Sequence, residues 1–374
     1  MGESTSSAAM NEQTDRARQE FARGLREKHP FVLVPAVGLV LVALLGVQWL
    51  FASGAFTALP ERMVLRVDHD DYTHVIYELA SLKRNPPKGL AIYLLGGSSA
   101  RECIDSAGAL AEQVSRETGL HVRAYNLASM NQSFAESMAI VDNLPRGPGL
   151  VLVAVSANRF GVPARKDRQE LAGENLVLES PSLRRFLVAE SGQGLVPPTL
   201  LPGIMNYALS YYEKHARRLA NGKPLFVPYT HGYTRGFDLS VKRAFVRVWL
   251  KGYRGESFTA NFAYNSRLLD SLLSAGQRRG FHMVLFETPE NREIVQHAYD
   301  AVKAIYQPRC AALAAAHGTR YLNFVDDAGL HNADFRDLTH LLKGSRAKFR
   351  RYLGNEVSHL VRSWFGATAV AVGG

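Results

Sequence analysis

The chain has 374 residues and 47% of them are hydrophobic, which excludes a globally disordered protein and permits a sizeable core. Its 44 Lys and Arg residues outnumber 34 Asp and Glu residues, and the formal net charge of +10 favours an anionic neighbour such as lipid headgroups or an acidic glycan. The two cysteines, Cys103 and Cys310, are too few for a fold built on disulfides, and one bridge or two free thiols both remain open.

Near the N-terminus, residues 31–52 form the apolar segment FVLVPAVGLVLVALLGVQWLFA, which contains no charge. At the rise of an α-helix, this segment is long enough to span the hydrocarbon layer of a membrane. We favour an uncleaved anchor over a signal peptide, because the apolar run is longer than a usual signal h-region and 30 residues precede it. A helix inside a globular core is disfavoured, since no face of the segment is polar.

The charges that flank this segment predict its orientation. Only Arg62 and Arg66 follow it closely, whereas five basic residues lie shortly before it. These five are Arg16, Arg18, Arg23, Arg26 and Lys28. The positive-inside rule therefore predicts a cytosolic N-terminal segment over residues 1–30 and a single-pass protein of the inner or plasma membrane. The part after about residue 55 is expected in a periplasm or at a cell surface, where nucleic acid is a poor partner.

From residue 91 onward, short apolar runs alternate with stretches that are compatible with helix. The runs predict strands over 91–95, 121–128, 149–156, 281–287 and 321–326. The other stretches predict helices over roughly 99–117, 132–144, 259–279, 290–317 and 341–363. This alternation favours an α/β fold, with a parallel sheet that is covered by helices on both faces.

Residues 160–258 interrupt the alternation and predict a partly helical insertion between the third and fourth strands. This insertion is rich in tyrosine and in basic residues, so a lid or partner surface and a purely structural excursion both remain open. The outer domain is expected over 57–365, and the sequence GATAVAVGG over 366–374 predicts a flexible tail.

The first predicted strand ends in GGSS, residues 96–99, which places a small hydroxyl residue between a strand and a helix. Such a serine caps the helix, helps to bind a phosphate, or acts as a nucleophile, and for the serine alone capping ranks first. The chain contains no GxxxxGK[ST], and GGSSAREC does not fit GxGxxG. It also lacks HExxH and paired Cys/His spacing, so no metal site is predicted.

Other polar residues follow the other predicted strands. Asn131 comes after the second strand, Ser156 and Asn158 come after the third, and Asp337 and His340 come after the fifth. The carboxyl ends of parallel strands meet at one edge of a sheet, where such folds bind their ligands. We therefore expect these residues to share one cleft.

On these stretches, in this order, the chain resembles the SGNH (GDSL-like) hydrolase superfamily. Its four motif blocks have counterparts in GGS (96–98), NLASMNQS (126–133), SAN (156–158) and DLTH (337–340). The resemblance covers about 91–160 and 281–350. It implies a flavodoxin-like, three-layer parallel sheet of SGNH type, with the insertion after the third strand.

By this resemblance Ser98 is the nucleophile, His340 is the base that activates it, and Asp337 orients the base. The residues implied for the oxyanion and for binding are Gly97, Asn131 and Asn158.

The sequence departs from the family pattern at several positions. Gly97 stands where the family has an Asp, and Asn131 and Ser156 stand where it has glycines. An Asn keeps a backbone amide in place only if it keeps the backbone conformation, which Asn tolerates better than most residues. The register of GGSS also allows Ser99 as an alternative nucleophile, although we favour Ser98.

The order of anchor and outer domain resembles membrane-anchored SGNH-like proteins of cell-envelope polysaccharide O-acylation, of the alginate acetylation and teichoic acid D-alanylation type. This implies an O-acyltransferase that carries the acyl group as an ester on Ser98 and passes it to a polysaccharide or other glycan. The implied partners are the lipid bilayer and a multi-spanning membrane-bound O-acyltransferase, and no cofactor is implied. An anchored esterase or deacetylase with the same triad, and a non-catalytic assembly or binding protein with the same fold, are the alternatives.

A pair of carboxylates for sugar cleavage is a further alternative, for which Glu287, Glu290 and Asp334 are the candidates. We instead expect Glu290 to cap the helix that begins there and the other two to be solvated.

Overall fold

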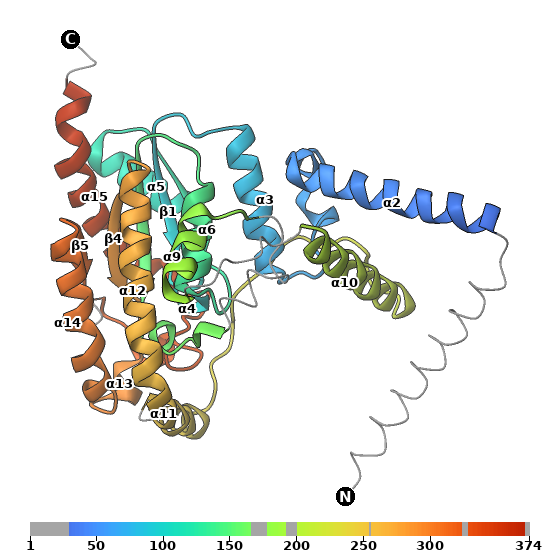
Figure 1. Ribbon diagram of the computed structural model, residues 1–374. Helices are drawn as coiled ribbons and strands as arrows, with labels where there is room; N and C mark the ends of the chain where they lie inside the picture. The colour runs from blue at the N-terminus through green and yellow to red at the C-terminus, as the bar shows by residue number, and fades with distance from the viewer. Residues whose placement is uncertain (1–29, 166–177, 192–199, 254–255, 324–327, 371–374) are drawn as a thin grey trace, which may run out of the picture. The chain divides into compact units, whose positions relative to one another are not determined.

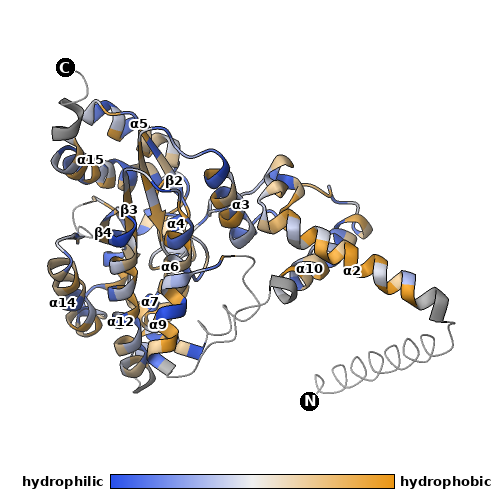
Figure 2. Ribbon diagram, turned by 45° about the horizontal axis from the view of Figure 1, so that its top comes forward, coloured by the Kyte–Doolittle hydropathy of each residue, from blue (hydrophilic) through white to orange (hydrophobic). Residues whose placement is uncertain are grey.

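The structure is a computed structural model that describes residues 30–165, 178–191, 200–253, 256–323 and 328–370. The chain divides after Ser53 into two compact units. In the first unit the structure describes helix α2, Pro30–Ala52, whose 23 residues rise over about 34 Å (Figure 1). Most of its described apolar side chains, including Leu39 and Trp49, are exposed, and Figure 2 shows the apolar character continuing along the helix. One N-terminal helix is therefore long and apolar enough to cross a membrane.

The second unit is built on a five-stranded parallel sheet with the strand order β2-β1-β3-β4-β5. Its strands are β1 (Leu90–Leu95), β2 (Val122–Asn126), β3 (Gly149–Val155), β4 (His282–Glu287) and β5 (Arg320–Leu322). This order is that of flavodoxin-like, doubly wound folds, so the prediction of an α/β fold with a parallel sheet is confirmed. The predicted fifth strand is shorter than expected, and residues 324–326 of it lie outside the part of the chain that the structure describes.

Side chains alternate along each strand and so serve two cores on opposite faces of the sheet. In β1, Tyr93 and Leu95 belong to one cluster of buried apolar residues, and Ile92 and Leu94 belong to the other. The helices on the Tyr93 face are α3 (Asp71–Arg84), α6 (Phe134–Asn143), α9 (Pro181–Ser191), α12 (Glu256–Arg278) and α14 (Asp300–Ala316). The helices on the Ile92 face are α5 (Ala107–Thr118) and α15 (Arg346–Val370). The sheet is thus the middle of three layers.

Two of the predicted helices are each broken in two. The helix predicted over 99–117 is α4 (Ser98–Arg101) followed by α5, because Ser106 starts a new helix by accepting a hydrogen bond from the amide of Ala109. The helix predicted over 290–317 is α13 (Arg292–Val295) followed by α14. Here Gln296 has a φ of 47°, and a residue in the left-handed region ends a right-handed helix.

The insertion over 160–258 is largely helical in the residues described. It contains α9, α10 (Leu200–Ala220), α11 (Leu239–Tyr253) and the first residues of α12, and it follows the short helix α7 (Ala157–Phe160). Among the described residues of this unit, 3₁₀ turns are found at η1 (Ala55–Ala58), η2 (Glu61–Met63) and η4 (Asn332–Asp334).

The segment 366–374, for which a flexible tail was predicted, overlaps the end of helix α15. Helix α15 continues to Val370, because the Ala-rich sequence favours helix and the single Gly366 costs only about 1 kcal/mol. Residues 371–374 lie outside the described part of the chain.

Cys103 and Cys310 are free thiols, and both are fully buried. They belong to the two different apolar clusters, on opposite faces of the sheet. Burial raises the pKa of each thiol, so both stay protonated and unreactive at neutral pH.

The turn from β1 into α4 requires glycine at residue 96. Gly96 has a φ of 153°, and a Cβ atom there would stand 2.6 Å from the Cβ of Ala154 and 2.7 Å from that of Ala100. We predict that Gly96→Ala lowers the free energy of unfolding by about 3 kcal/mol, through backbone strain and overpacking. Denaturant unfolding of the purified chain, followed by circular dichroism, measures this loss.

Gly97→Ala is the matched control. Gly97 has a φ of −71°, and no atom lies within 4 Å of a Cβ placed on it. This substitution should change the free energy of unfolding by no more than about 0.5 kcal/mol. Equal losses from the two substitutions would show that the space around Gly96 relaxes, and the prediction would be wrong.

Candidate active site

A chain of three side chains joins the end of the first strand to the loop before α15. His340 Nε2 lies 2.8 Å from Ser98 Oγ, and His340 Nδ1 lies 2.8 Å and 2.9 Å from the two carboxylate oxygens of Asp337. Ser98 is the first residue of α4, directly beyond the carboxyl end of β1. The structure therefore brings together the three residues that the resemblance places in a triad.

The Asp337 carboxylate holds its own loop as well as the imidazole. Its Oδ1 accepts hydrogen bonds from the backbone amides of Thr339 and His340, each at 3.0 Å. Burial raises the pKa of Asp337, but the hydrogen bond and charge of His340 and these two amides outweigh it, so the net pKa is lowered. An ionised Asp337 favours the tautomer in which His340 carries its proton on Nδ1 and leaves Nε2 to accept from Ser98.

Ser99 has a different partner from Ser98. Its hydroxyl donates to Thr339 Oγ1 at 2.9 Å, and Thr339 precedes the histidine in the same loop. Of the two adjacent serines, Ser98 is therefore the one at hydrogen-bond distance from the imidazole.

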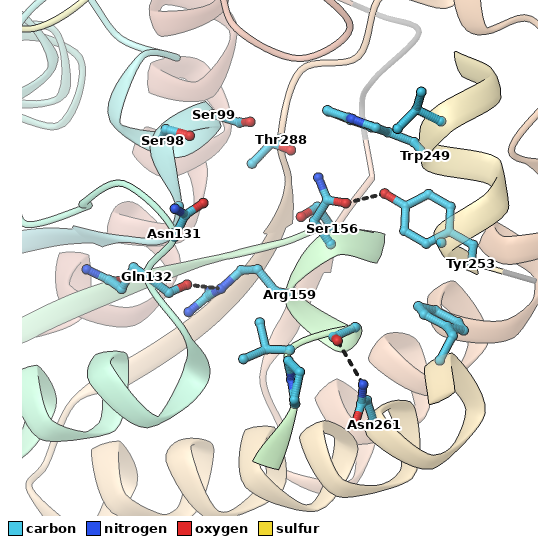
Figure 3. A pocket seen from close by; sticks show the side chains of 18 residues that line it. Ser98, Ser99, Asn131, Gln132, Ser156, Arg159, Trp249, Tyr253, Asn261 and Thr288 are labelled. Carbon is cyan, nitrogen blue, oxygen red and sulfur yellow. Dashed lines mark hydrogen bonds between the residues drawn. The ribbon is translucent and has the colours of Figure 1, made fainter. Parts of the chain in front are cut away.

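A pocket of about 490 Å³ opens beside Ser98, and the remaining predicted residues line it (Figure 3). Asn131 has a φ of 58°, so it keeps the left-handed backbone that a glycine would supply. Asn158 accepts a hydrogen bond on Oδ1 from the hydroxyl of Tyr253, which leaves its NH₂ group as the donor side. Ser156 has an extended φ of −165°, so a serine in place of glycine creates no strain.

Two buried residues connect the ends of three strands: Arg159, a polar residue that follows the third predicted strand, and Gln132, which the sequence did not single out. Gln132 accepts from the amide of Gly96 at 2.8 Å and donates to the carbonyl of Leu127 at 2.8 Å. Arg159 donates to the carbonyls of Gln132 and Ser133 at 3.1 Å and 2.8 Å. Gln132 lies inside the second motif block and Arg159 directly follows the third, but sequence alone does not distinguish a buried polar side chain from a solvated one.

The insertion contacts the loop that carries Asp337 and His340 and stabilises it. Lys242 of α11 is 3% exposed and donates to the backbone carbonyls of Asn332 and Phe335, at 3.0 Å and 2.8 Å. The Tyr233 ring stands edge-on to the His340 ring, with ring centroids 5.8 Å apart. The insertion therefore contributes to the site and is not a remote excursion.

A buried cluster of charges supports the other side of α4. Arg101 pairs with Asp71 of α3 and, at 2.7 Å, with Glu102, and the fully buried Glu102 also pairs with Arg346 of α15. His231 of the insertion lies 3.4 Å from Glu102. Burial and the neighbouring Arg101 lower the pKa of His231 to about 4, so it is neutral at physiological pH. Four separate parts of the chain thus meet behind the helix that presents Ser98.

A second pocket of about 390 Å³ adjoins the first, and the two share Asn158, Thr288 and the rings of Trp249 and Tyr253. Figure 3 shows both rings projecting from α11 toward the pocket. Trp249 is stacked on Tyr299 with an angle of 10° between the rings. The second pocket has polar side chains on its walls, among them Lys303, Gln307 and Asn323. A groove with an aromatic wall and polar groups therefore extends away from Ser98.

The three carboxylates that were weighed as a sugar-cleaving pair have separate partners. Glu287 accepts from the hydroxyls of Tyr306 and Tyr321, and Asp334 pairs with Lys348 at 2.9 Å. The prediction that Glu287 and Asp334 are solvated is wrong, because they are only 3% and 6% exposed. The prediction that Glu290 caps a helix is also wrong. Helix α13 begins at Arg292 after Asn291, and an ion pair with Lys303 holds the Glu290 carboxylate.

No protein-family model matches the chain, and no curated protein matches it. What this site does is therefore argued from its geometry.

The buried carboxyl of Glu287 gives a pH-dependence that can be measured. Burial raises its pKa to about 7, and the hydrogen bonds from Tyr321 and Tyr306 oppose this only in part. The folded state keeps the proton up to about pH 7, whereas the unfolded chain releases it near the model-peptide value of about 4.3. The carboxyl therefore destabilises the fold as pH rises through this window.

We predict that Glu287→Gln removes this loss. The free energy of unfolding of the variant minus that of the wild type should increase by roughly 2 to 3 kcal/mol as the pH rises from 5 to 8. Denaturant unfolding of both proteins at matched pH measures the difference, in which the contributions of other titrating groups cancel. Parallel pH curves for the two proteins would contradict the prediction.

Proposed function

We propose that the protein is a membrane-anchored, SGNH-type serine O-acyltransferase that passes an acyl group to a hydroxyl of a cell-surface polysaccharide or other glycan. The observation that carries this proposal is the hydrogen-bonded chain from Ser98 Oγ through His340 to the Asp337 carboxylate. A serine hydroxyl is a weak nucleophile, and an adjacent imidazole oriented by a carboxylate is the arrangement that activates it.

In the proposed first half-reaction, Ser98 Oγ attacks the acyl carbonyl while His340 Nε2 takes its proton. The oxyanion of the tetrahedral intermediate would be stabilised by donors that line the pocket, with the NH₂ group of Asn158 and the backbone at Asn131 as candidates. Collapse of the intermediate breaks the bond to the donor's leaving group, which receives the proton from His340. The acyl group remains as an ester on Ser98.

In the second half-reaction, His340 takes the proton of the acceptor hydroxyl as that oxygen attacks the ester carbonyl. The new ester forms on the acceptor, and Ser98 leaves with the proton returned by His340. Every proton thus passes through one imidazole, and no other acid or base is needed.

The groove beside Ser98 supports a glycan as the acceptor. Its wall includes the faces of Trp249 and Tyr253, and aromatic faces suit the apolar faces of sugar rings. Polar side chains on the other walls suit the hydroxyls of a sugar. The apolar helix α2 and the charges around it support a position outside the membrane for this unit. A multi-spanning membrane-bound O-acyltransferase is the proposed source of the acyl group.

An anchored esterase with the same residues is the second candidate. The side chain of His340 is 17% exposed, so water as well as a glycan hydroxyl has access to the base. The ratio of transfer to hydrolysis therefore separates the two candidates.

We predict that a fluorophosphonate probe labels Ser98 in the full chain, held in detergent or in nanodiscs. Ser98→Ala should abolish labelling, and His340→Ala should slow it by about 10³-fold or more, because the serine loses its base. Mass spectrometry of the labelled peptide identifies the serine. Ser99→Ala is the matched control, since the Ser99 hydroxyl bonds Thr339 and should leave labelling within a few-fold of wild type.

An adduct on Ser99 would show that Ser99, and not Ser98, is the nucleophile. If a folded chain forms no adduct on any serine, the acyl-serine mechanism is wrong. After acetylation by an activated ester, release of the acetyl group to added oligosaccharide rather than to water would favour the transferase.

We also predict that the Tyr253 hydroxyl positions Asn158. Tyr253→Phe should slow acylation of Ser98 by an activated ester about tenfold, less than the ~10² expected for Asn158→Ala, because a mobile donor stabilises the oxyanion less than a fixed one. Tyr299→Phe is the control: in the described part of the chain, the buried Tyr299 hydroxyl has no hydrogen-bond partner. Equal rates for the two Phe variants would contradict this role.

A further inference from the structure

Helix α10 presents an apolar stripe to solvent. Met205, Leu209, Tyr212 and Leu219 are 43%, 65%, 75% and 66% exposed. Their spacing of four, three and seven residues places them on one face of the helix. On another face, Tyr207 is buried against the rest of the second unit. The stripe is therefore not the face by which α10 packs on its own unit.

The buried face fixes α10 to a part of the chain that lies close in sequence to α2. The hydroxyl of Tyr211 donates to the carbonyl of Met63 at 2.8 Å, and that of Tyr207 donates to the carbonyl of Val64. Val64 follows Ala52, the last residue of α2, by 12 residues. A tether of 12 residues reaches at most about 40 Å, and η1 and η2 lie within it and shorten it. A membrane that holds α2 is thus within reach of α10.

The charge of α10 suits an anionic surface. The helix contains three Lys or Arg residues and one acidic residue, Glu213, which pairs with Arg217 at 2.6 Å. Lys214 on the helix and Lys223 just beyond it are exposed. An amphipathic helix with a basic polar side and large apolar residues opposite is typical of helices that lie in a membrane interface. Cations on such a helix are attracted to anionic lipid headgroups.

We propose that α10 lies in the headgroup region of the membrane that holds α2, with its apolar stripe toward the acyl chains and with Lys214 and Lys223 on anionic headgroups. This inference rests on the membrane anchor of the proposed function and not on the acyl chemistry. It gives the outer unit a second contact with the lipid surface, so that the groove beside Ser98 stays near the membrane where an acyl donor is delivered.

The test uses the full chain in nanodiscs and an environment-sensitive fluorophore on Leu209→Cys. Cys103 and Cys310 are fully buried, so the dye reacts with the introduced thiol in the folded protein. The discs contain phosphatidylcholine alone or with phosphatidylglycerol, and a nitroxide lipid with its spin label at the top of the acyl chain acts as quencher. The same dye on Glu112→Cys, at an exposed position of α5, is the control.

In discs with phosphatidylglycerol, the emission at position 209 should shift to the blue and be quenched, since an interfacial helix buries its apolar face about 5–10 Å deep. The emission at position 112 should stay that of a dye in water. Adding Lys214→Gln and Lys223→Gln to the Leu209→Cys chain should weaken the contact about fivefold in equilibrium constant for each cation removed.

A dye at position 209 that stays in water in both kinds of disc, on a chain that co-elutes with the discs, would overturn the proposal. Shielding of the dye that appears only after membrane proteins are added would also overturn it, in favour of a protein partner. Quenching that is equal in both lipids and insensitive to the Lys variants would overturn the anionic part. A chain that does not enter the discs would overturn the anchor and this proposal together. Labelling of Ser98 by a fluorophosphonate in the same discs tests the acyl chemistry separately.

Discussion

The pairing of one buried carboxylate, that of Glu102, is the constraint on which the arrangement of the site depends. A fully buried and unpaired carboxylate is strongly destabilising, so the fold is viable only where cations reach it. Those cations are Arg101 from α4 and Arg346 from the start of α15, with His231 of the insertion beside them. Because α4 begins with Ser98 and α15 follows the loop of His340, the pairing of Glu102 also constrains the distance between Ser98 and His340. The ion pairs of Glu102 with Arg101 and Arg346 therefore help to position the elements that carry Ser98 and His340.

The insertion gives the site much of what the five-stranded sheet lacks. Its helix α11 supplies Lys242, whose ammonium group fastens the loop before His340, and also the aromatic residues Trp249 and Tyr253 on the wall of the groove. The N-terminal part of α11 thus holds the loop before His340, and its C-terminal part forms a wall of the groove. The aromatic wall of the groove and the loop of His340 are therefore held by the same helix, so a displacement of α11 would affect both.

The central strands were predictable because β1, β3 and β4 are short, mostly apolar runs, and buried parallel strands have this composition. The order of the strands was expected from the resemblance and not from composition. The breaks in the helices were not predictable, since Gln296 turns left-handed within a sequence that otherwise favours helix. At Asn131 the sequence left open whether the backbone conformation of a glycine is kept, and the φ of 58° shows that it is. Lys242 and Gln132 could not be assigned, as their partners are tertiary: the amine of Lys242 bonds a carbonyl 93 residues away. Glu290 was assigned to a cap on local grounds, and an ion pair to Lys303, 13 residues on, determines its position instead.

The sequence distance between Ser98 and His340 has a consequence for biogenesis. The two residues are 242 positions apart, and the insertion and four of the five strands of the sheet lie between them. At a synthesis rate of about 5–20 residues per second, the serine leaves the ribosome roughly 12 to 48 s before the histidine. Under the proposed function, Ser98 has no base until His340 has been synthesised, and a product truncated before His340 would carry the serine without the imidazole that activates it. The proposed acyl transfer could therefore begin only when the second unit is nearly complete.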